Sequence, residues 1–126
     1  MSSTVTTGLK RSFTAGGTIG QYRAVQISSG NVIAADDSAG TLAIGVAGIS
    51  DRSASSGETV TIALSNAGGT AFLTMSEAVT AGTAVYATTG GKGALVGTTT
   101  HDALIGTALT AASADGDVIE VLLADR

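Results

Sequence analysis

The stretch Gly57-Glu58-Thr59-Val60-Thr61-Ile62-Ala63-Leu64 decides the fold, because a close variant of it recurs 59 residues later as Gly116-Asp117-Val118-Ile119-Glu120-Val121-Leu122-Leu123. In each copy a glycine and an acidic residue precede a run with apolar residues at alternate positions. That period of two is typical of a β-strand with one buried face. The chain therefore carries the same strand, with the same entry, twice.

The duplication extends beyond these two strands. Three landmarks recur at nearly constant offsets, which are 60 residues from Val25 to Val85, 61 from Gly45 to Gly106 and 59 from Gly57 to Gly116. An offset that stays this constant indicates two copies of one small β unit fused in a single chain. We expect two pseudo-symmetric halves, at about residues 12–66 and 70–123.

Composition supports an all-β fold. The chain of 126 residues has 18 glycines, no proline and only four aromatic residues. Short apolar runs separated by glycine turns predict a small β-barrel or β-sandwich. The expected strands are Leu9–Thr14, Ala24–Ile27, Val32–Ala35, Thr41–Ile49, Thr59–Leu64, Thr70–Thr74, Thr83–Ala87, Ala94–Val96, Ala103–Leu109 and Val118–Leu123.

Length, cysteine content and charge bound the class of protein. The length predicts a single β domain over residues 12–126, preceded by an extended N-terminal arm at 1–11. The absence of cysteine, of a signal-type apolar start and of a membrane-spanning run predicts a soluble protein made in a reducing cytoplasm. Residues 1–35 carry a net charge of +3 and residues 36–126 a net charge of −7. The acidic body argues against nucleic acid as the main partner, because phosphate contacts require clustered Lys and Arg. The basic N-terminal strip is suited to an acidic partner.

The motifs that carry chemistry are weak. His101-Asp102 is the only histidine beside a carboxylate, and no Ser or Thr sits in a nucleophile-type sequence, so a hydrolase centred on His101 is a minor alternative. Asp36-Asp37 and Asp115-Gly116-Asp117 lack the spacing of a calcium loop and are interpreted as turn residues. The loop Gly90-Gly91-Lys92-Gly93 fails the phosphate-binding pattern, because Tyr86 stands where the first glycine is needed. We expect no catalytic residues, no cofactor and no metal.

The ordered set of structural motifs resembles one family. Ala81-Gly82-Thr83-Ala84-Val85-Tyr86, Leu104-Ile105-Gly106-Thr107-Ala108-Leu109 and Gly116-Asp117-Val118-Ile119-Glu120-Val121-Leu122 are similar to segments of phage capsid cement, or head decoration, proteins. Ile44-Gly45-Val46-Ala47 and Gly57-Glu58-Thr59-Val60-Thr61-Ile62 extend the similarity into the first half. The resemblance covers roughly residues 12 to 123. The arm at 1–11 lies outside it.

The resemblance implies a structural protein, not an enzyme, that binds the outer surface of the mature phage head and stabilises contacts between capsomers. The implied partner is the major capsid protein, and members often act as trimers. The protein would be made in the cytoplasm of the host bacterium and end on the outside of the capsid, with no nucleic acid or membrane as partner. An extended arm can add a strand to a sheet of another protein. We therefore hypothesise that the capsid-binding residues are Thr4, Val5, Thr6, Thr7, Leu9, Lys10 and Arg11.

The main alternative is another virion or surface module, such as a tail, fibre or adhesin domain that binds protein or a glycan. Binding of a sugar usually relies on exposed aromatic rings, and the chain has no tryptophan and two tyrosines. The internal duplication favours the capsid hypothesis, because a repeated β unit suits a scaffold built for shape.

Overall fold

The computed structural model describes residues 9–35, 47–65, 69–88, 90–95 and 104–123. These residues form ten strands and no α-helix, which confirms the predicted all-β class. The strands are β1 (Lys10–Thr14), β2 (Ala24–Ser28), β3 (Asn31–Ala34), β4 (Gly48–Ser50), β5 (Thr59–Leu64), β6 (Thr70–Thr74), β7 (Ala84–Ala87), β8 (Gly93–Ala94), β9 (Leu104–Ala108) and β10 (Val118–Leu123).

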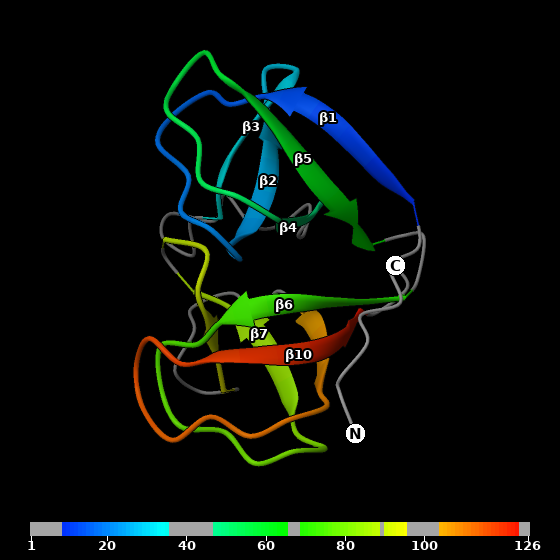
Figure 1. Ribbon diagram of the computed structural model, residues 1–126, viewed down its shortest axis with the longest axis vertical. Coiled ribbons are helices and arrows are strands. Elements are labelled where there is room, and N and C mark those ends of the chain that lie inside the picture. Colours follow the sequence, from blue (N-terminus) through cyan, green and yellow to red (C-terminus); the bar gives the residue numbers. More distant parts are fainter. Residues whose placement is uncertain (1–8, 36–46, 66–68, 89, 96–103, 124–126) are drawn as a thin grey trace.

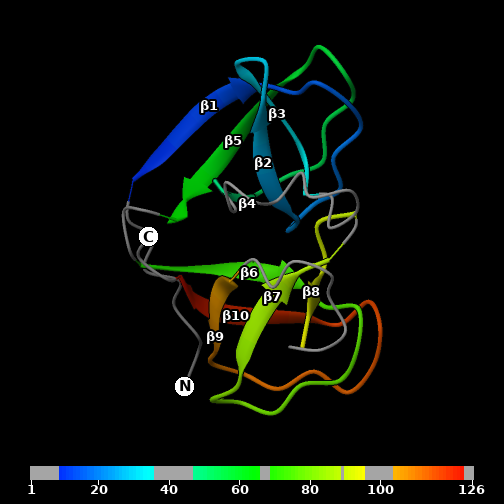
Figure 2. The same ribbon diagram turned by 180° about the vertical axis from the view of Figure 1, so that it is seen from behind.

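The strands make two antiparallel five-stranded sheets with the same order. The first sheet runs β1-β5-β4-β2-β3 and the second β6-β10-β9-β7-β8. Each strand of the second sheet thus takes the place of the strand five positions earlier. Figure 1 shows the two sheets one above the other along the long axis, and Figure 2 shows them from behind. Of the two architectures predicted, the sandwich fits, because neither sheet closes into a barrel.

The correspondence reaches single hydrogen bonds outside the strands. Four isolated bridges form two matched pairs, which are Ala15↔Val32 with Met75↔Gly93 and Ile19↔Ala54 with Val79↔Ala112. In both halves the first bridge is parallel and the second antiparallel. Each sheet therefore curls in the same way, so that one edge strand approaches the other edge at one end.

The structure corrects one element of the predicted repeat. Gly48 pairs with Val25 and Leu64, and Gly106 pairs with Val85 and Leu123 in the same way. The counterpart of Gly106 is therefore Gly48, at an offset of 58, and not Gly45. The sequence was ambiguous here because Ile44-Gly45 and Ala47-Gly48 both place a glycine after an apolar residue. Gly45 itself, like most of the predicted strand Thr41–Ile49, lies outside the described residues.

The two matched glycines are required by close packing. A Cβ on Gly48 would overlap the carbonyl oxygen of Ala63, and a Cβ on Gly106 would overlap that of Leu122. In both halves the obstacle is the backbone of the neighbouring strand, which cannot rotate away as a side chain can. Glycine therefore fixes how closely β4 packs on β5 and how closely β9 packs on β10.

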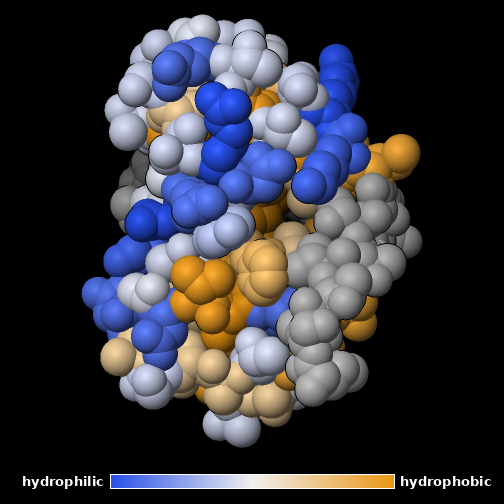
Figure 3. Space-filling view, viewed as in Figure 1, coloured by the Kyte–Doolittle hydropathy of each residue, from blue (hydrophilic) through white to orange (hydrophobic). Residues whose placement is uncertain are grey.

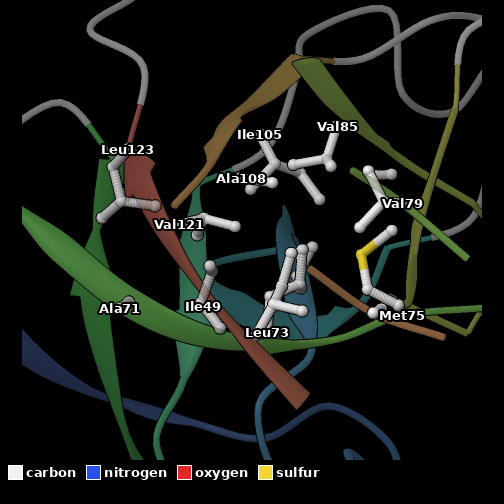
Figure 4. Close-up of a cluster of buried hydrophobic side chains, with 14 of the residues drawn as sticks. Ile49, Ala71, Leu73, Met75, Val79, Val85, Ile105, Ala108, Val121 and Leu123 are labelled. Carbon is white, nitrogen blue, oxygen red and sulfur yellow. The ribbon is translucent and has the colours of Figure 1, made fainter. Parts of the chain in front are cut away.

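The core is divided unequally between the halves. The first half has a small core of its own, formed by Ala15, Ile19, Val25, Val32, Ala54, Val60 and Ile62. A larger cluster contains the apolar face of the second sheet together with Ala24, Ala35, Ile49 and Ala63 from the first. Figure 4 shows Ile49 of β4 among side chains of the second sheet, near Leu73 and Val121. The first sheet thus uses both faces, one for its own core and one to pack against the second sheet.

Direct contacts join the two halves at the start of β2. The Thr74 N–H donates to the Tyr22 carbonyl at 2.8 Å, and the Ala24 N–H donates to the Gly91 carbonyl at 2.7 Å. The rings of Tyr22 and Phe72 lie 5.5 Å apart at 59°. Tyr22 has a φ of 57°, in the left-handed region, whereas its counterpart in the second half is Gly82. The strained backbone at Tyr22 is therefore held where the halves meet.

Candidate interaction surface

The residues predicted to bind the capsid are only partly within the described structure. Thr4, Val5, Thr6 and Thr7 lie outside the described residues. Leu9 is 69% exposed, and its carbonyl accepts a hydrogen bond from the Leu64 N–H at 3.1 Å. Lys10 and Arg11 are the first two residues of β1. The structure therefore brings the last three predicted residues together at the start of one edge strand.

β1 is the edge of the first sheet and is largely exposed. It pairs with β5 on one side only, and four of its five residues are exposed. The hydrogen bond to the Leu9 carbonyl and the bond from the Ala15 N–H to the Glu58 carbonyl lie at the two ends of this pairing. In an antiparallel pair, alternate residues direct their backbone groups towards the partner strand. Residues 9, 11, 13 and 15 therefore face β5, and the N–H and C=O groups of Lys10, Ser12 and Thr14 point away from it.

The two cations of this strand lie on opposite faces of the sheet, as neighbouring residues in a strand do. Lys10 Nζ is 3.5 Å from Asp51 Oδ2, with both side chains substantially exposed. Arg11 lies over the Phe13 ring, with its guanidinium carbon 4.9 Å from the ring centroid. An exposed ion pair of this length contributes little to stability. Both cations therefore stay accessible to a partner.

A cleft of about 300 Å³ lies beside β1, where the sheets meet. Its lining is Lys10, Tyr22, Ile49, Ser50, Asp51, Ala63, Ala71 and Phe72. The first six come from the first half and the last two from β6. The lining combines apolar side chains with one cation and one carboxylate, and thus suits an inserted side chain better than a charged small molecule.

The second sheet exposes apolar side chains that sequence reasoning did not single out. Val118 is 46% and Leu122 49% exposed on the outer side of β10, and Leu104 and Leu109 are exposed on and just after β9. Figure 3 shows apolar surface over the lower half of the molecule and mainly hydrophilic surface over the upper half. The sequence indicates this apolar surface only through a difference between the repeats. Val118 stands where the first half has Thr59.

Two acidic residues serve the turns that enter the matched strands. The Ser55 N–H donates to Glu58 Oε1 at 2.6 Å, and the Ser113 N–H and hydroxyl both donate to Asp117 Oδ2 at 2.8 Å. The hydrogen bonds from Ser113, with a weaker one from the Ala114 N–H, hold the pKa of Asp117 below its usual value. This agrees with the interpretation of Asp117 as a turn residue.

The other sequences considered for chemistry do not form a site in the described part of the chain. Asp115 makes an ion pair with Lys92 at 2.8 Å. No group of three or more potential metal ligands occurs among the described residues. His101-Asp102 and Asp36-Asp37 fall outside them. Nor do the described segments contain a helix able to span a lipid bilayer.

Gly90 and Gly91 belong to the loop that does not fit the phosphate-binding pattern. In the structure they pack against the first half. The Gly90 N–H donates to the Ala35 carbonyl at 3.0 Å, and the Gly90 carbonyl accepts a bond from Arg23 Nη1 at 3.3 Å. A Cβ on Gly91 would overlap the Ala24 carbonyl. This glycine turn therefore fits closely against the first half.

Comparison with known proteins identifies the family. The chain matches the phage cement protein family over residues 6–123, nearly its whole length. It belongs to that family. The resemblance inferred from the repeated motifs is therefore confirmed, and the chain is a phage structural protein and a component of the virion capsid.

A solved structure shares the fold of this cement protein. It is the N-terminal base of the head fibre protein gp8.5 of bacteriophage phi29, with a TM-score of 0.63 and 10% sequence identity over 93% of this chain and 94% of that one. At this identity the likeness concerns the fold alone. No curated protein matches the chain.

Proposed function

We propose that this cement protein binds the outer surface of the mature phage head through the major capsid protein and stabilises the contacts between neighbouring capsomers. Membership of the phage cement family is the observation that carries the proposal. The broad, open sheet surfaces of the described residues support it, because they suit contact with another protein. In this role the protein is not an enzyme and needs no cofactor or metal.

The contact with the shell is assigned to the predicted N-terminal arm, residues 1–11, whose last two residues begin β1 of the β domain. Thr4, Val5, Thr6 and Thr7 supply residues with a preference for extended structure, and Leu9 supplies an exposed apolar side chain. Lys10 and Arg11 supply positive charge next to an acidic body. These features suit an acidic surface on the shell.

The energetic basis is mass action. A protein that binds only the assembled shell stabilises it by about 4 kcal/mol per site when its free concentration is a thousand times the dissociation constant. Many copies acting on one shell add these contributions. Association as a trimer would let each unit hold several capsomers at once, and it also follows from the resemblance. The protein is made in the host cytoplasm and joins the outside of the capsid there.

A second candidate is an attachment module for a fibre. The shared fold with the base of a head fibre protein favours this alternative over a tail or adhesin domain. Such a base would still bind the head but would carry a further domain or partner outward, and it would occur at few positions on each particle.

Copy number separates the two candidates. Quantitative mass spectrometry of purified virions should find this chain in a ratio near one to one with the major capsid protein, as expected for a protein that covers the lattice. A few copies per virion would favour the fibre-base alternative. Absence from the particle would contradict both.

A companion experiment tests the arm. Deleting residues 2–8 leaves β1 complete, and we expect it to weaken binding to heads while the thermal unfolding midpoint stays unchanged. Binding at the original affinity would show that Thr4 to Thr7 do not contribute.

A further inference from the structure

We infer that the free edge of β1 receives an extended acidic segment of the shell protein, which pairs with it as a sixth strand of the first sheet. This inference rests on the proposed function, because it names the structural element at which the capsid would be bound. It differs from the hypothesis of an arm that adds a strand to a sheet of the shell protein, since β1 is already paired with β5 along its full length.

The backbone of β1 is prepared for such pairing. The N–H and C=O groups of Lys10, Ser12 and Thr14 point away from β5, as the register at the two ends of the strand requires. Ser12 is exposed, and the sheet has no further strand on that side of β1. A row of such groups on an exposed edge is a template for another strand.

The second half of the same chain shows how the outward-facing backbone of this edge strand can bind another segment. Thr74 of β6 is the counterpart of Thr14, and its N–H donates to the Tyr22 carbonyl at 2.8 Å. Its hydroxyl also donates to the Gln21 carbonyl at 3.3 Å. In β6 the outward backbone direction is therefore used to bind the turn at Gln21-Tyr22 of the first half. In β1 the C-terminal end lies next to β3, whose Val32 bridges Ala15, and the edge at Lys10 and Ser12 has no further strand beside it in the sheet.

Charge identifies the occupant. An incoming strand places successive side chains on opposite faces, where one would lie near Lys10 and the next near Arg11. Two acidic residues in succession would therefore meet both cations. A second copy of this chain pairing through its own β1 would offer no carboxylate to Lys10 or Arg11, because this strand contains no acidic residue. The edge thus favours an acidic strand over a second copy of β1.

The decisive variant is Ser12→Pro, with Ser12→Ala as its matched control. Proline removes the Ser12 N–H and places its ring on the free edge, while the bonds to β5 come from residues 11 and 13. Alanine keeps the N–H and removes only the hydroxyl. Binding to heads assembled without this protein is measured by titration and co-sedimentation. We expect Ser12→Pro to weaken binding by about tenfold or more, as for loss of a hydrogen bond with added steric conflict, and Ser12→Ala to match the wild type.

The outcomes separate this inference from the proposed function. If the wild-type protein does not bind heads, the proposed function fails. If the wild type binds and Ser12→Pro binds as well as Ser12→Ala, the inference fails while the function stands. If size-exclusion chromatography shows that Ser12→Pro dissociates an oligomer of the isolated protein, the occupant is a second copy and the inference is overturned.

A second variant leaves the backbone unchanged. It tests the inference even if Ser12→Pro does not fold. Arg11→Glu reverses one exposed charge that lies over Phe13. We expect it to weaken binding by about tenfold at low salt, with the difference from wild type shrinking as ionic strength rises. Equal affinity of Arg11→Glu and wild type for heads at low salt would show that the segment bound at β1 is not acidic.

Discussion

β1 and β6 occupy the same place in their two sheets, yet one edge is open and the other is covered. Four of the five residues of β1 are exposed, whereas three of the five in β6 are buried and none is exposed. Both strands pair with a neighbour in the same register. The difference lies on the far side, where the Thr74 N–H of β6 donates to the Tyr22 carbonyl, whereas β1 is approached at its C-terminal end by β3, whose Val32 bridges Ala15. Duplication thus produced two equivalent edge strands, one that contacts a turn of the other half and one that stays largely exposed.

The halves diverge most where they meet. Phe72, which packs on Tyr22, stands at the position of the exposed Ser12. Tyr22 in turn stands at the position of Gly82. The residues that build the shared fold, by contrast, are repeated, as with Gly48 and Gly106. The junction is therefore a specialisation added to a common β unit.

The largest expected effect tests what the halves share. Gly106→Ala places a Cβ against the Leu122 carbonyl, and Gly48→Ala does the same against Ala63. Because the obstacle is backbone, the strands must separate, and we expect each variant to lose about 3 kcal/mol of unfolding free energy. Urea denaturation measures the loss.

The control for both glycine variants is Gly17→Ala, because a Cβ there meets nothing within 4 Å and the backbone is not in the left-handed region. We expect its stability to stay within about 0.5 kcal/mol of the wild type. If Gly48→Ala were as stable as this control, the structural equivalence of Gly48 and Gly106 would be wrong.

The next effect separates the covered edge from the open one. Phe72→Ala removes a half-buried ring that packs 5.5 Å from that of Tyr22, and we expect it to cost about 2 kcal/mol. Ser12→Ala changes the equivalent position on the open edge and should be neutral. Chemical denaturation of both variants, side by side, measures the difference. Equal costs would mean that the junction is no more important for stability than the free edge.

Much of this fold could be predicted from the sequence, because apolar residues at alternate positions identify a β-strand. The predicted bounds of Thr59–Leu64, Thr70–Thr74 and Val118–Leu123 coincide with β5, β6 and β10. The near-continuous apolar run at 41–49 carries no alternation, so it could not fix the register at Gly48. Lys10 and Arg11 lie in the predicted strand Leu9–Thr14, and the structure places both in β1 with exposed side chains.

The open edge itself could not be predicted, because it depends on which strands become neighbours. Sequence period tells which face of a strand is buried but not whether its edge is paired. The junction of Tyr22 with Phe72 joins residues 50 positions apart and leaves no local pattern. The exposed leucines of the second sheet were likewise hidden, since alternation alone does not tell which of two faces meets solvent.

A smaller effect concerns the turn before β10, whose contribution to stability depends on pH. The pKa of Asp117 is lowered by hydrogen bonds from Ser113 and Ala114, so its ionised form stabilises the fold above the unfolded pKa, near 3.8. This contribution is lost as the pH falls through the lower folded pKa. We expect Asp117→Asn to be less stable than wild type at pH 7 and to approach it at pH 2. Unfolding midpoints in urea at both values measure this. A constant difference would show that the carboxylate charge is not responsible.

The smallest effect concerns the turn between β2 and β3, which the second half does not reproduce. Ser29 and Gly30 both have positive φ, 52° and 83°, as in a two-residue hairpin turn of type I′. The connection between β7 and β8 is longer. Asparagine tolerates the left-handed region better than serine, so Ser29→Asn should raise stability by about 0.5 kcal/mol. Ser29→Ala should lower it, because alanine gains no local hydrogen bond there. Thermal denaturation of both variants measures the difference. Equal stability of Ser29→Asn and Ser29→Ala would show that the left-handed conformation of this residue does not limit the stability of the turn.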